Sequence, residues 1–105
     1  GDANNWKGKL TELYVTQLGR LPDEAGLAFW QAQLAGGKSW DEVSAAVIDS
    51  DEGRRRYVQE LYVFLLGREP DKAGLNAWVK ELAAGRTRAQ VFQGFIQSEE
   101  YKNKR

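Results

Sequence analysis

The chain has 105 residues, of which 42% are hydrophobic and 29% charged, and its fifteen basic side chains balance fifteen acidic ones. This length suits one domain with a modest core, and a net charge of zero provides no field that would draw the chain onto nucleic acid. The absence of Cys and His excludes a disulfide scaffold, a histidine general base and a zinc site, and leaves only oxygen-ligand metals such as calcium or magnesium open. We expect no enzymatic activity, no cofactor and no bound metal.

The first helix is predicted from about Trp6 to Leu18, because apolar residues recur there at helical spacing. Residues 1–5 are expected to be the edge of a linker, and a single helical domain is expected over residues 6–105. Gly19 is placed to cap the C-terminal end of this helix, since glycine enters the left-handed conformation at little cost. No apolar run approaches the roughly 20 residues that a membrane span needs, so we expect no membrane insertion.

A second helix is predicted to begin at Asp23, whose carboxylate can accept hydrogen bonds from the first turn, after Pro22 has stopped the preceding helix. Its apolar face carries Leu27, Trp30 and Leu34. The segment Ser39–Glu42 is a capping box that opens a third helix.

Ser50 is predicted to cap the fourth helix, a long one with an apolar side made of Tyr57, Leu61, Tyr62, Leu65 and Leu66. Later helices are predicted to begin at Asp71 and Thr87, and a short closing turn at Ser98. No segment shows the alternation of a strand, so the fold class is expected to be all-α.

The chain contains an internal repeat of 48 residues. When residues 13–53 are placed on residues 61–101, 19 of 41 positions are identical, far more than chance would give. Repeat one is expected over about residues 6–50 and repeat two over about 51–101. The fold is therefore predicted to be a compact bundle of six to seven short helices from two tandem repeats, with a core of Leu13, Leu18, Leu27, Trp30, Leu34, Leu61, Leu66, Leu75, Trp78, Leu82, Phe95 and Ile96.

The most distinctive repeated motif is L-G-R-x-P-D-x-x-G-L, which is typical of a corner between two helices. The motif positions are Gly19, Arg20, Pro22, Asp23 and Gly26 in repeat one, and Gly67, Arg68, Pro70, Asp71 and Gly74 in repeat two. Each arginine is expected to pair with the capping carboxylate or with exposed carbonyls at the helix end. The second glycine of each motif, Gly26 or Gly74, falls inside a helix, which indicates close backbone approach by a neighbouring helix or loop.

With this motif, the chain resembles the bacterial domain of unknown function 4214, whose members carry L-Y-x-x-x-L-G-R-x-P-D-x-x-G-x-x-x-W. Both copies match it, at residues 13–30 and 61–78. The family's trailing S-x-E-[YF] is present at Ser98–Tyr101, whereas Gly53 replaces the aromatic residue in the first copy. The resemblance implies a module of large secreted or surface proteins, similar also to phycobilisome linker domains and phage structural modules, without known catalytic activity.

Four tryptophans invite a saccharide-binding interpretation, because an indole face can stack on a sugar ring. Trp30 and Trp78 occupy equivalent positions on apolar faces and are expected in the core. Trp40 and Trp6 are less constrained and are our candidate ligand-binding residues. A calcium loop at Asp49–Glu60 is disfavoured, because its sixth position is Arg54 instead of glycine.

The leading hypothesis is a non-enzymatic binding or spacer module of a larger secreted or surface-exposed bacterial protein, with saccharide as the expected ligand class. The alternative is a structural scaffold or linker module with protein partners, in an assembly such as a phage particle or a phycobilisome-like array. The first places the chain outside the cell or at its surface, and the second allows a virion.

Overall fold

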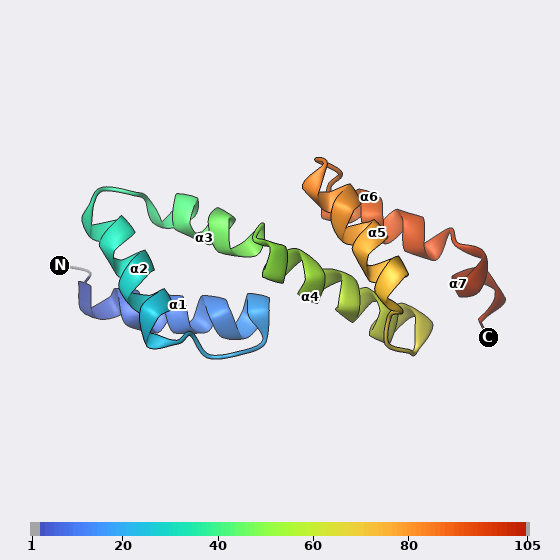
Figure 1. The fold of residues 1–105 in the computed structure, drawn as a ribbon, viewed down its shortest axis with the longest axis horizontal. Helices are drawn as coiled ribbons and strands as arrows, with labels where there is room; N and C mark the ends of the chain where they lie inside the picture. Colours follow the sequence, from blue (N-terminus) through green and yellow to red (C-terminus); the bar gives the residue numbers. More distant parts are fainter. Residues whose placement is uncertain (1–2, 105) are drawn as a thin grey trace. The chain divides into compact units, whose positions relative to one another are not determined.

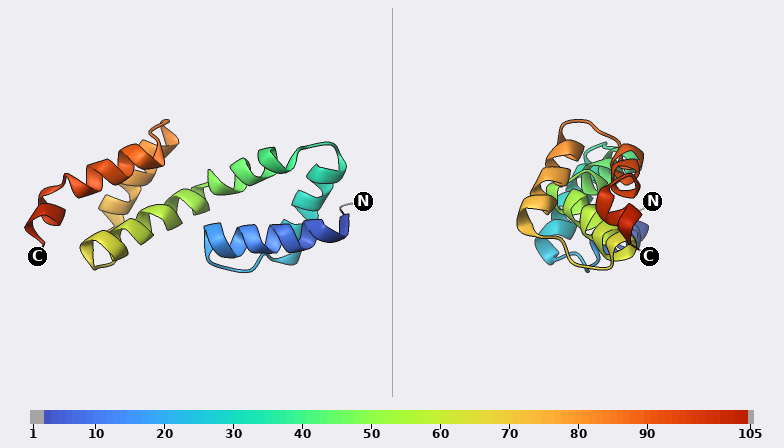
Figure 2. Two further views of the ribbon diagram at one scale, coloured as in Figure 1. Left: turned by 180° about the vertical axis from the view of Figure 1, so that it is seen from behind. Right: turned by 90° about the vertical axis from the view of Figure 1, so that its right-hand side faces the viewer.

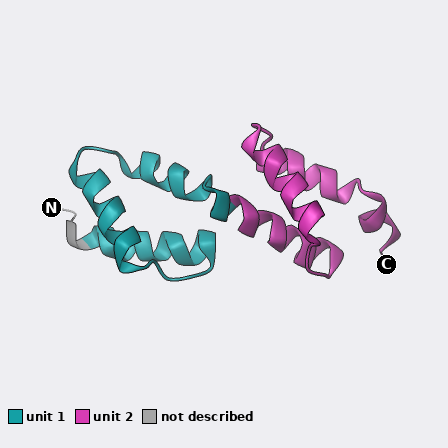
Figure 3. Cartoon of the chain, viewed as in Figure 1, with its two compact units in different colours: residues 1–53 teal, residues 54–105 magenta. Residues whose placement is uncertain are grey.

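The computed structural model describes residues 3–104, and the side chains of residues 5–104. This part of the chain contains helices and no strand, so the predicted all-α fold class is confirmed. The elements are α1 (Ala3–Leu18), α2 (Glu24–Ala35), α3 (Trp40–Ile48), α4 (Asp51–Leu61), the π-helical segment η1 (Tyr62–Leu66), α5 (Lys72–Ala83), α6 (Arg88–Ile96) and α7 (Glu99–Asn103) (Figure 1). They form two compact units, Gly1–Gly53 and Arg54–Arg105 (Figure 3).

In unit 1, the helices α1, α2 and α3 contact one another (Figures 1 and 2). One buried cluster joins Leu13, Tyr14 and Leu18 of α1 to Val47 of α3, and a second joins Leu10, Leu34 and Val43. Trp30 and Trp40 are partly buried and pack against both clusters. Burial of these apolar side chains, at about 25 cal/mol per Å², is what holds three short helices together.

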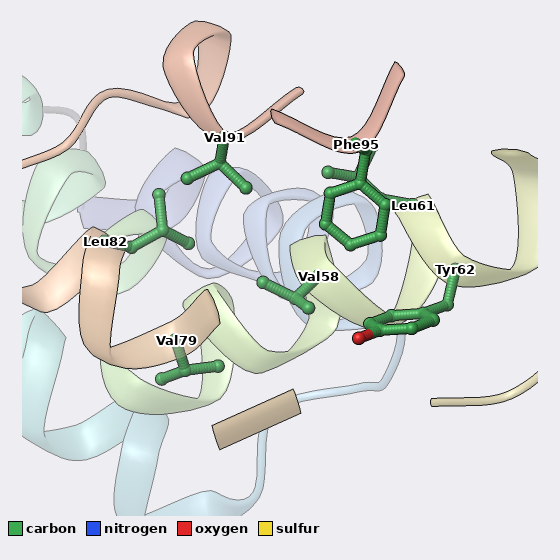
Figure 4. Close-up of a cluster of buried hydrophobic side chains, with 7 residues drawn as sticks. All are labelled: Val58, Leu61, Tyr62, Val79, Leu82, Val91 and Phe95. Carbon is green, nitrogen blue, oxygen red and sulfur yellow. The ribbon is translucent and has the colours of Figure 1, made fainter. Parts of the chain in front are cut away.

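The core of unit 2 is one cluster drawn from four consecutive elements (Figure 4). Val58 and Leu61 come from α4, Tyr62 from η1, and the remaining four residues from α5 and α6: Val79, Leu82, Val91 and Phe95. The side chains of Val58 and Val91 are fully buried. Each unit therefore has a core of its own.

The predicted helix starts are confirmed by their capping hydrogen bonds. The Ser39 hydroxyl accepts from the Glu42 amide at 3.1 Å, and the Glu42 carboxylate accepts from the Ser39 amide at 2.9 Å. Thr87 and Gln90 form the same box at 3.0 and 2.9 Å. Capping residues of this kind contribute about 1 kcal/mol each.

Gly19 and Gly67 end the first helix of their repeats with φ angles of 71° and 70°, as predicted. The two helix ends nevertheless differ. In unit 1 the α-helix continues to Leu18, whereas in unit 2 the last turn widens into η1, where the Gly67 amide donates to the Tyr62 carbonyl five residues earlier. This π-helical turn was not predicted.

Six of the predicted core residues are buried: Leu13, Leu18, Leu34, Leu61, Leu82 and Phe95. The other six are half-buried: Leu27, Trp30, Leu66, Leu75, Trp78 and Ile96. Helix α1 begins at Ala3, ahead of the start expected near Trp6, since nothing in residues 3–5 blocks a helical backbone.

Candidate functional site

In each repeat, a tryptophan of the second helix packs against the buried cluster that contains a tyrosine of the first helix. Trp30 donates its Nε1–H to the Tyr14 hydroxyl at 3.1 Å, and Trp78 packs against the cluster that contains Tyr62. Tyr62 is 5% exposed, and burial raises the pKa of its hydroxyl. The indole N–H of the half-buried Trp30 thus has its hydrogen-bond partner inside unit 1.

The motif glycine in the second helix lies against this tyrosine. A Cβ atom added at Gly26 would lie 2.9 Å from the Tyr14 hydroxyl and 2.8 Å from the capping Asp23 carboxylate. At Gly74 the corresponding atoms belong to Tyr62 and Asp71. The close approach predicted at these glycines is therefore made by two side chains, and the expectation of a neighbouring backbone was wrong. The cause is the length of tyrosine, whose hydroxyl reaches the first turn of the next helix.

The motif arginine holds a glutamate 32 residues further along the chain. Arg20 donates from Nε and Nη2 to the two carboxylate oxygens of Glu52, at 2.6 and 2.9 Å. Arg68 binds Glu100 in the same bidentate way at 2.7 and 2.8 Å. These hydrogen bonds lower the pKa of both glutamates and raise the pKa of both arginines.

The predicted partners of these arginines, the capping carboxylate or backbone carbonyls, account for only some of their contacts. Arg20 also donates to the carbonyl of Leu21 at 3.1 Å, and Arg68 lies 3.8 Å from the Asp71 carboxylate. Each guanidinium lies over the ring of the buried tyrosine, at 5.1 Å for Tyr14 and 5.0 Å in the second repeat. The glutamate was missed as a partner, although it is identical in the two copies.

These contacts define a signature cluster in each repeat: Tyr14, Arg20, Asp23, Gly26, Trp30 and Glu52 in unit 1, and Tyr62, Arg68, Asp71, Gly74, Trp78 and Glu100 in unit 2. Pro22 and Pro70 are half-buried and immediately precede the capping aspartates. The polar groups of the cluster bind one another, which favours a structural role for the motif. In the described part of the chain, no three acidic side chains are grouped so that they could hold a metal ion.

Trp40, a candidate ligand-binding residue, lines a hollow of about 220 Å³ on unit 1. The other lining residues are Lys9, Glu12, Leu13, Thr16 and Ser44. The indole is half-buried, and the Lys9 ammonium lies 4.6 Å from its ring centroid. The hollow thus combines one aromatic ring with donors and acceptors, but the lysine lies over the ring that a sugar would stack on.

Trp6, the second candidate, is also half-buried. It packs against the cluster of Leu10, Leu34 and Val43, against which Trp40 packs as well. The structure therefore brings the two candidates to one buried cluster, and Trp40 is the one that lines the hollow.

A second hollow, of about 320 Å³, lies on unit 2 beside the π-helical segment. Its apolar side is formed by Val63 and by Phe64, whose side chain is 78% exposed. Arg56, Gln59, Glu60 and Glu69 complete it. In repeat one, Thr16 occupies the position of Phe64, so the exposed ring belongs to the second copy alone.

Comparison with known proteins identifies one family. Residues 9–56 and residues 53–105 each match the family described as "Domain of unknown function (DUF4214)". The chain matches no curated protein and no solved structure. None of the helices in the described residues is both long and apolar enough to span a membrane.

Proposed function

The chain belongs to the DUF4214 family, and we propose that it is a non-enzymatic binding or spacer module of a longer secreted or surface-exposed bacterial protein. One observation carries this proposal. Residues shared by the two copies bind one another within each compact unit: in unit 1, Arg20 binds Glu52 and Trp30 binds Tyr14. This use of the motif supports a repeated structural unit. In such a unit, contacts with other molecules are made by the residues that differ between the two copies.

For the ligand, we propose a saccharide bound at the Trp40 hollow. The hollow offers an aromatic ring together with hydrogen-bonding groups from Lys9, Glu12, Thr16 and Ser44, the combination that recognises a polar ring with apolar faces. Binding would require the Lys9 ammonium to move from the indole ring, at a cost of about 0.5–1 kcal/mol for an exposed cation–π contact.

The alternative, a scaffold or linker module with a protein partner, is supported by unit 2. Phe64 and Val63 are 78% and 42% exposed beside the second hollow. Exposed aromatic residues are enriched where proteins bind one another.

A glycan array tests the saccharide proposal, with the purified chain in calcium-containing buffer and again with chelator. Thr16→Arg fills the Trp40 hollow, and Thr11→Arg is its matched control, because both hydroxyls donate to the carbonyl four residues earlier. We expect specific binding that Thr16→Arg abolishes and Thr11→Arg retains. A blank array, or equal binding by both variants, contradicts the saccharide site, and a blank array favours the protein-partner alternative.

A further inference from the structure

The Lys9 ammonium in the Trp40 hollow has an aromatic partner but no acidic one. It lies 4.6 Å from the Trp40 ring centroid, and no carboxylate of the described residues pairs with it. In unit 2 the same two positions exchange roles: Arg88, equivalent to Trp40, lies 4.6 Å from the ring of Tyr57, equivalent to Lys9. The Tyr57 hydroxyl also donates to the Arg88 carbonyl at 3.2 Å, which fixes that ring. In the described part of unit 1, the indole face alone holds the Lys9 ammonium.

Glu12, which lines the same hollow, lacks the partner that its equivalent in repeat two has. In repeat two, Arg56 donates to the Glu60 carboxylate at 3.1 Å. Glu60 is equivalent to Glu12, and Arg56 is equivalent to Gly8, which has no side chain. Among the described residues, no basic side chain therefore pairs with the Glu12 carboxylate. The hollow thus presents one cation and one carboxylate on the same face of α1, both without an ion-pair partner.

The hollow itself depends on two small side chains. Thr16 and Ser44 line it, at positions where repeat two has Phe64 and Phe92. The Thr16 hydroxyl donates to the Glu12 carbonyl at 2.9 Å, so its oxygen is left to accept a hydrogen bond from a ligand. Its volume of about 220 Å³ is below the roughly 300–1,000 Å³ of sites for drug-sized ligands, and it suits a single sugar ring.

We propose that the saccharide of the Trp40 hollow is an acidic one, whose carboxylate binds Lys9 while its ring lies on Trp40 and its hydroxyls donate to Glu12. This inference rests on the proposed function, because it names the class of sugar for the same site. In a uronic acid, C5 carries the carboxylate, across the pyranose ring from the C2 hydroxyl. The two charges of the hollow therefore meet opposite ends of one ring, and the ligand carboxylate is kept away from Glu12.

The cation on the indole face is the reason why an acidic sugar is favoured over a neutral one. A neutral ring displaces the Lys9 ammonium from Trp40 and gives it no new partner, so a cation–π contact is lost. An acidic ring displaces the same ammonium but supplies a carboxylate, which the flexible four-carbon stem of lysine allows it to reach. We expect about fivefold tighter binding of an acidic sugar than of its neutral analogue, the upper end for an exposed ion pair.

The test is an array of oligosaccharides of glucuronic, galacturonic and mannuronic acid, each printed as the free acid and as its methyl ester, in buffer with chelator. Esterification removes the charge but keeps the ring and its linkage, and the chelator prevents calcium from bridging carboxylates. The original chain should bind a free acid about fivefold more tightly than its ester, and Lys9→Gln should bind both equally. Lys7→Gln is the matched control and should keep the preference, since Lys7 is an exposed lysine of the same helix that does not line the hollow. Both lysines are exposed, so both variants are expected to fold, which circular dichroism checks.

Equal binding of acid and ester by the original chain, or binding of neutral glycans only, would overturn this inference and leave the saccharide proposal in place. A preference for the acid that survives in Lys9→Gln would also overturn it, because the carboxylate would then be bound elsewhere. Loss of the preference in Lys7→Gln as well would assign it to overall charge and overturn it too. A chain that binds no glycan, acidic or neutral, would overturn both this inference and the saccharide proposal.

Discussion

Arg20 and Glu52, 32 residues apart, are joined by two parallel hydrogen bonds of 2.6 and 2.9 Å. The pair ties the loop after α1 to the first turn of α4, and it recurs between Arg68 and Glu100. A bidentate guanidinium–carboxylate contact fixes direction as well as distance. The pair therefore sets where the first helix of the following repeat begins.

We expect a double-mutant cycle of Arg20→Ala and Glu52→Gln to give a coupling energy of about 0.5–1 kcal/mol. Both side chains are close to half exposed, which places the pair within the range of surface ion pairs, and the bidentate geometry favours the upper end. Urea unfolding at pH 7 measures it. The matched control is the Arg86–Glu81 pair, which has similar exposure but one hydrogen bond, and for which a smaller coupling is expected. A coupling energy for Arg86–Glu81 as large as that for Arg20–Glu52 would contradict the role given to the bidentate geometry.

Two glycine-to-alanine substitutions are expected to act in opposite directions. Gly8→Ala should stabilise the chain by about 0.5–1 kcal/mol, because Gly8 lies inside α1 with no atom near its added Cβ. Gly26→Ala should destabilise it by about 1–2 kcal/mol, since the new methyl group meets the Tyr14 hydroxyl and the Asp23 carboxylate. Thermal or urea unfolding distinguishes the two.

The tyrosine contact can be isolated by adding Tyr14→Phe to Gly26→Ala. Removing the hydroxyl relieves the contact at 2.9 Å, so the double variant should be more stable than the sum of the two single changes implies. Strict additivity would show that the hydroxyl is not what requires glycine at this position.

Stability is expected to fall on acidification. The pKa of Glu52 is lowered chiefly by its hydrogen bonds from Arg20, that of Glu100 by Arg68, and that of Glu42 by the backbone amide of Ser39. A carboxyl group with a folded pKa below its ordinary value of 4.5 stabilises the protein above that value, and this contribution is lost as the pH falls through the folded pKa.

Between about pH 6 and 8 the free energy of unfolding should be flat, since the chain has no histidine. Urea unfolding from pH 7 to pH 3 measures the acid loss. The variant with Glu42→Gln, Glu52→Gln and Glu100→Gln should lose less stability over this range than the original chain. An unchanged pH dependence would assign the acid sensitivity to other carboxyl groups.

Two phenylalanines of unit 2 should respond very differently to truncation. Phe95 is 2% exposed and contacts the rings of both Tyr62 and Trp78, so Phe95→Ala should cost about 3–5 kcal/mol. Phe64 is 78% exposed, so Phe64→Ala should change stability by less than about 0.5 kcal/mol. A large loss at Phe64 would mean that its ring stabilises the fold and is not an available contact surface.

The sequence was sufficient for features that depend on local chemistry. The caps at Ser39, Asp71 and Thr87 follow from side chains that reach amides two or three residues away, and a 48-residue repeat is visible by alignment. Contacts between residues far apart in the sequence were harder to predict. The Arg20–Glu52 pair spans 32 residues, and only the identity of both residues in the second copy could have indicated it.

The candidate site was predicted only in part, for a related reason. The spacing of apolar residues did not indicate whether Trp40 and Trp6 are buried. Helical periodicity shows which side chains share a face of one helix, but not which of them other helices cover. In the structure both tryptophans pack against one buried cluster of unit 1. The exposed Phe64 was not predicted as a contact residue, because its surroundings depend on a π-helical turn that has no counterpart in repeat one.

The tryptophans also give each unit spectroscopic labels of its own. Trp78 is the one tryptophan in the sequence of unit 2, and it is close to Phe95, at 4.9 Å between ring centroids. Biosynthetic incorporation of fluorotryptophan would thus yield one fluorine resonance for unit 2 and three for unit 1, at Trp6, Trp30 and Trp40. Heating a single labelled sample would then show directly whether the two copies melt together or one after the other.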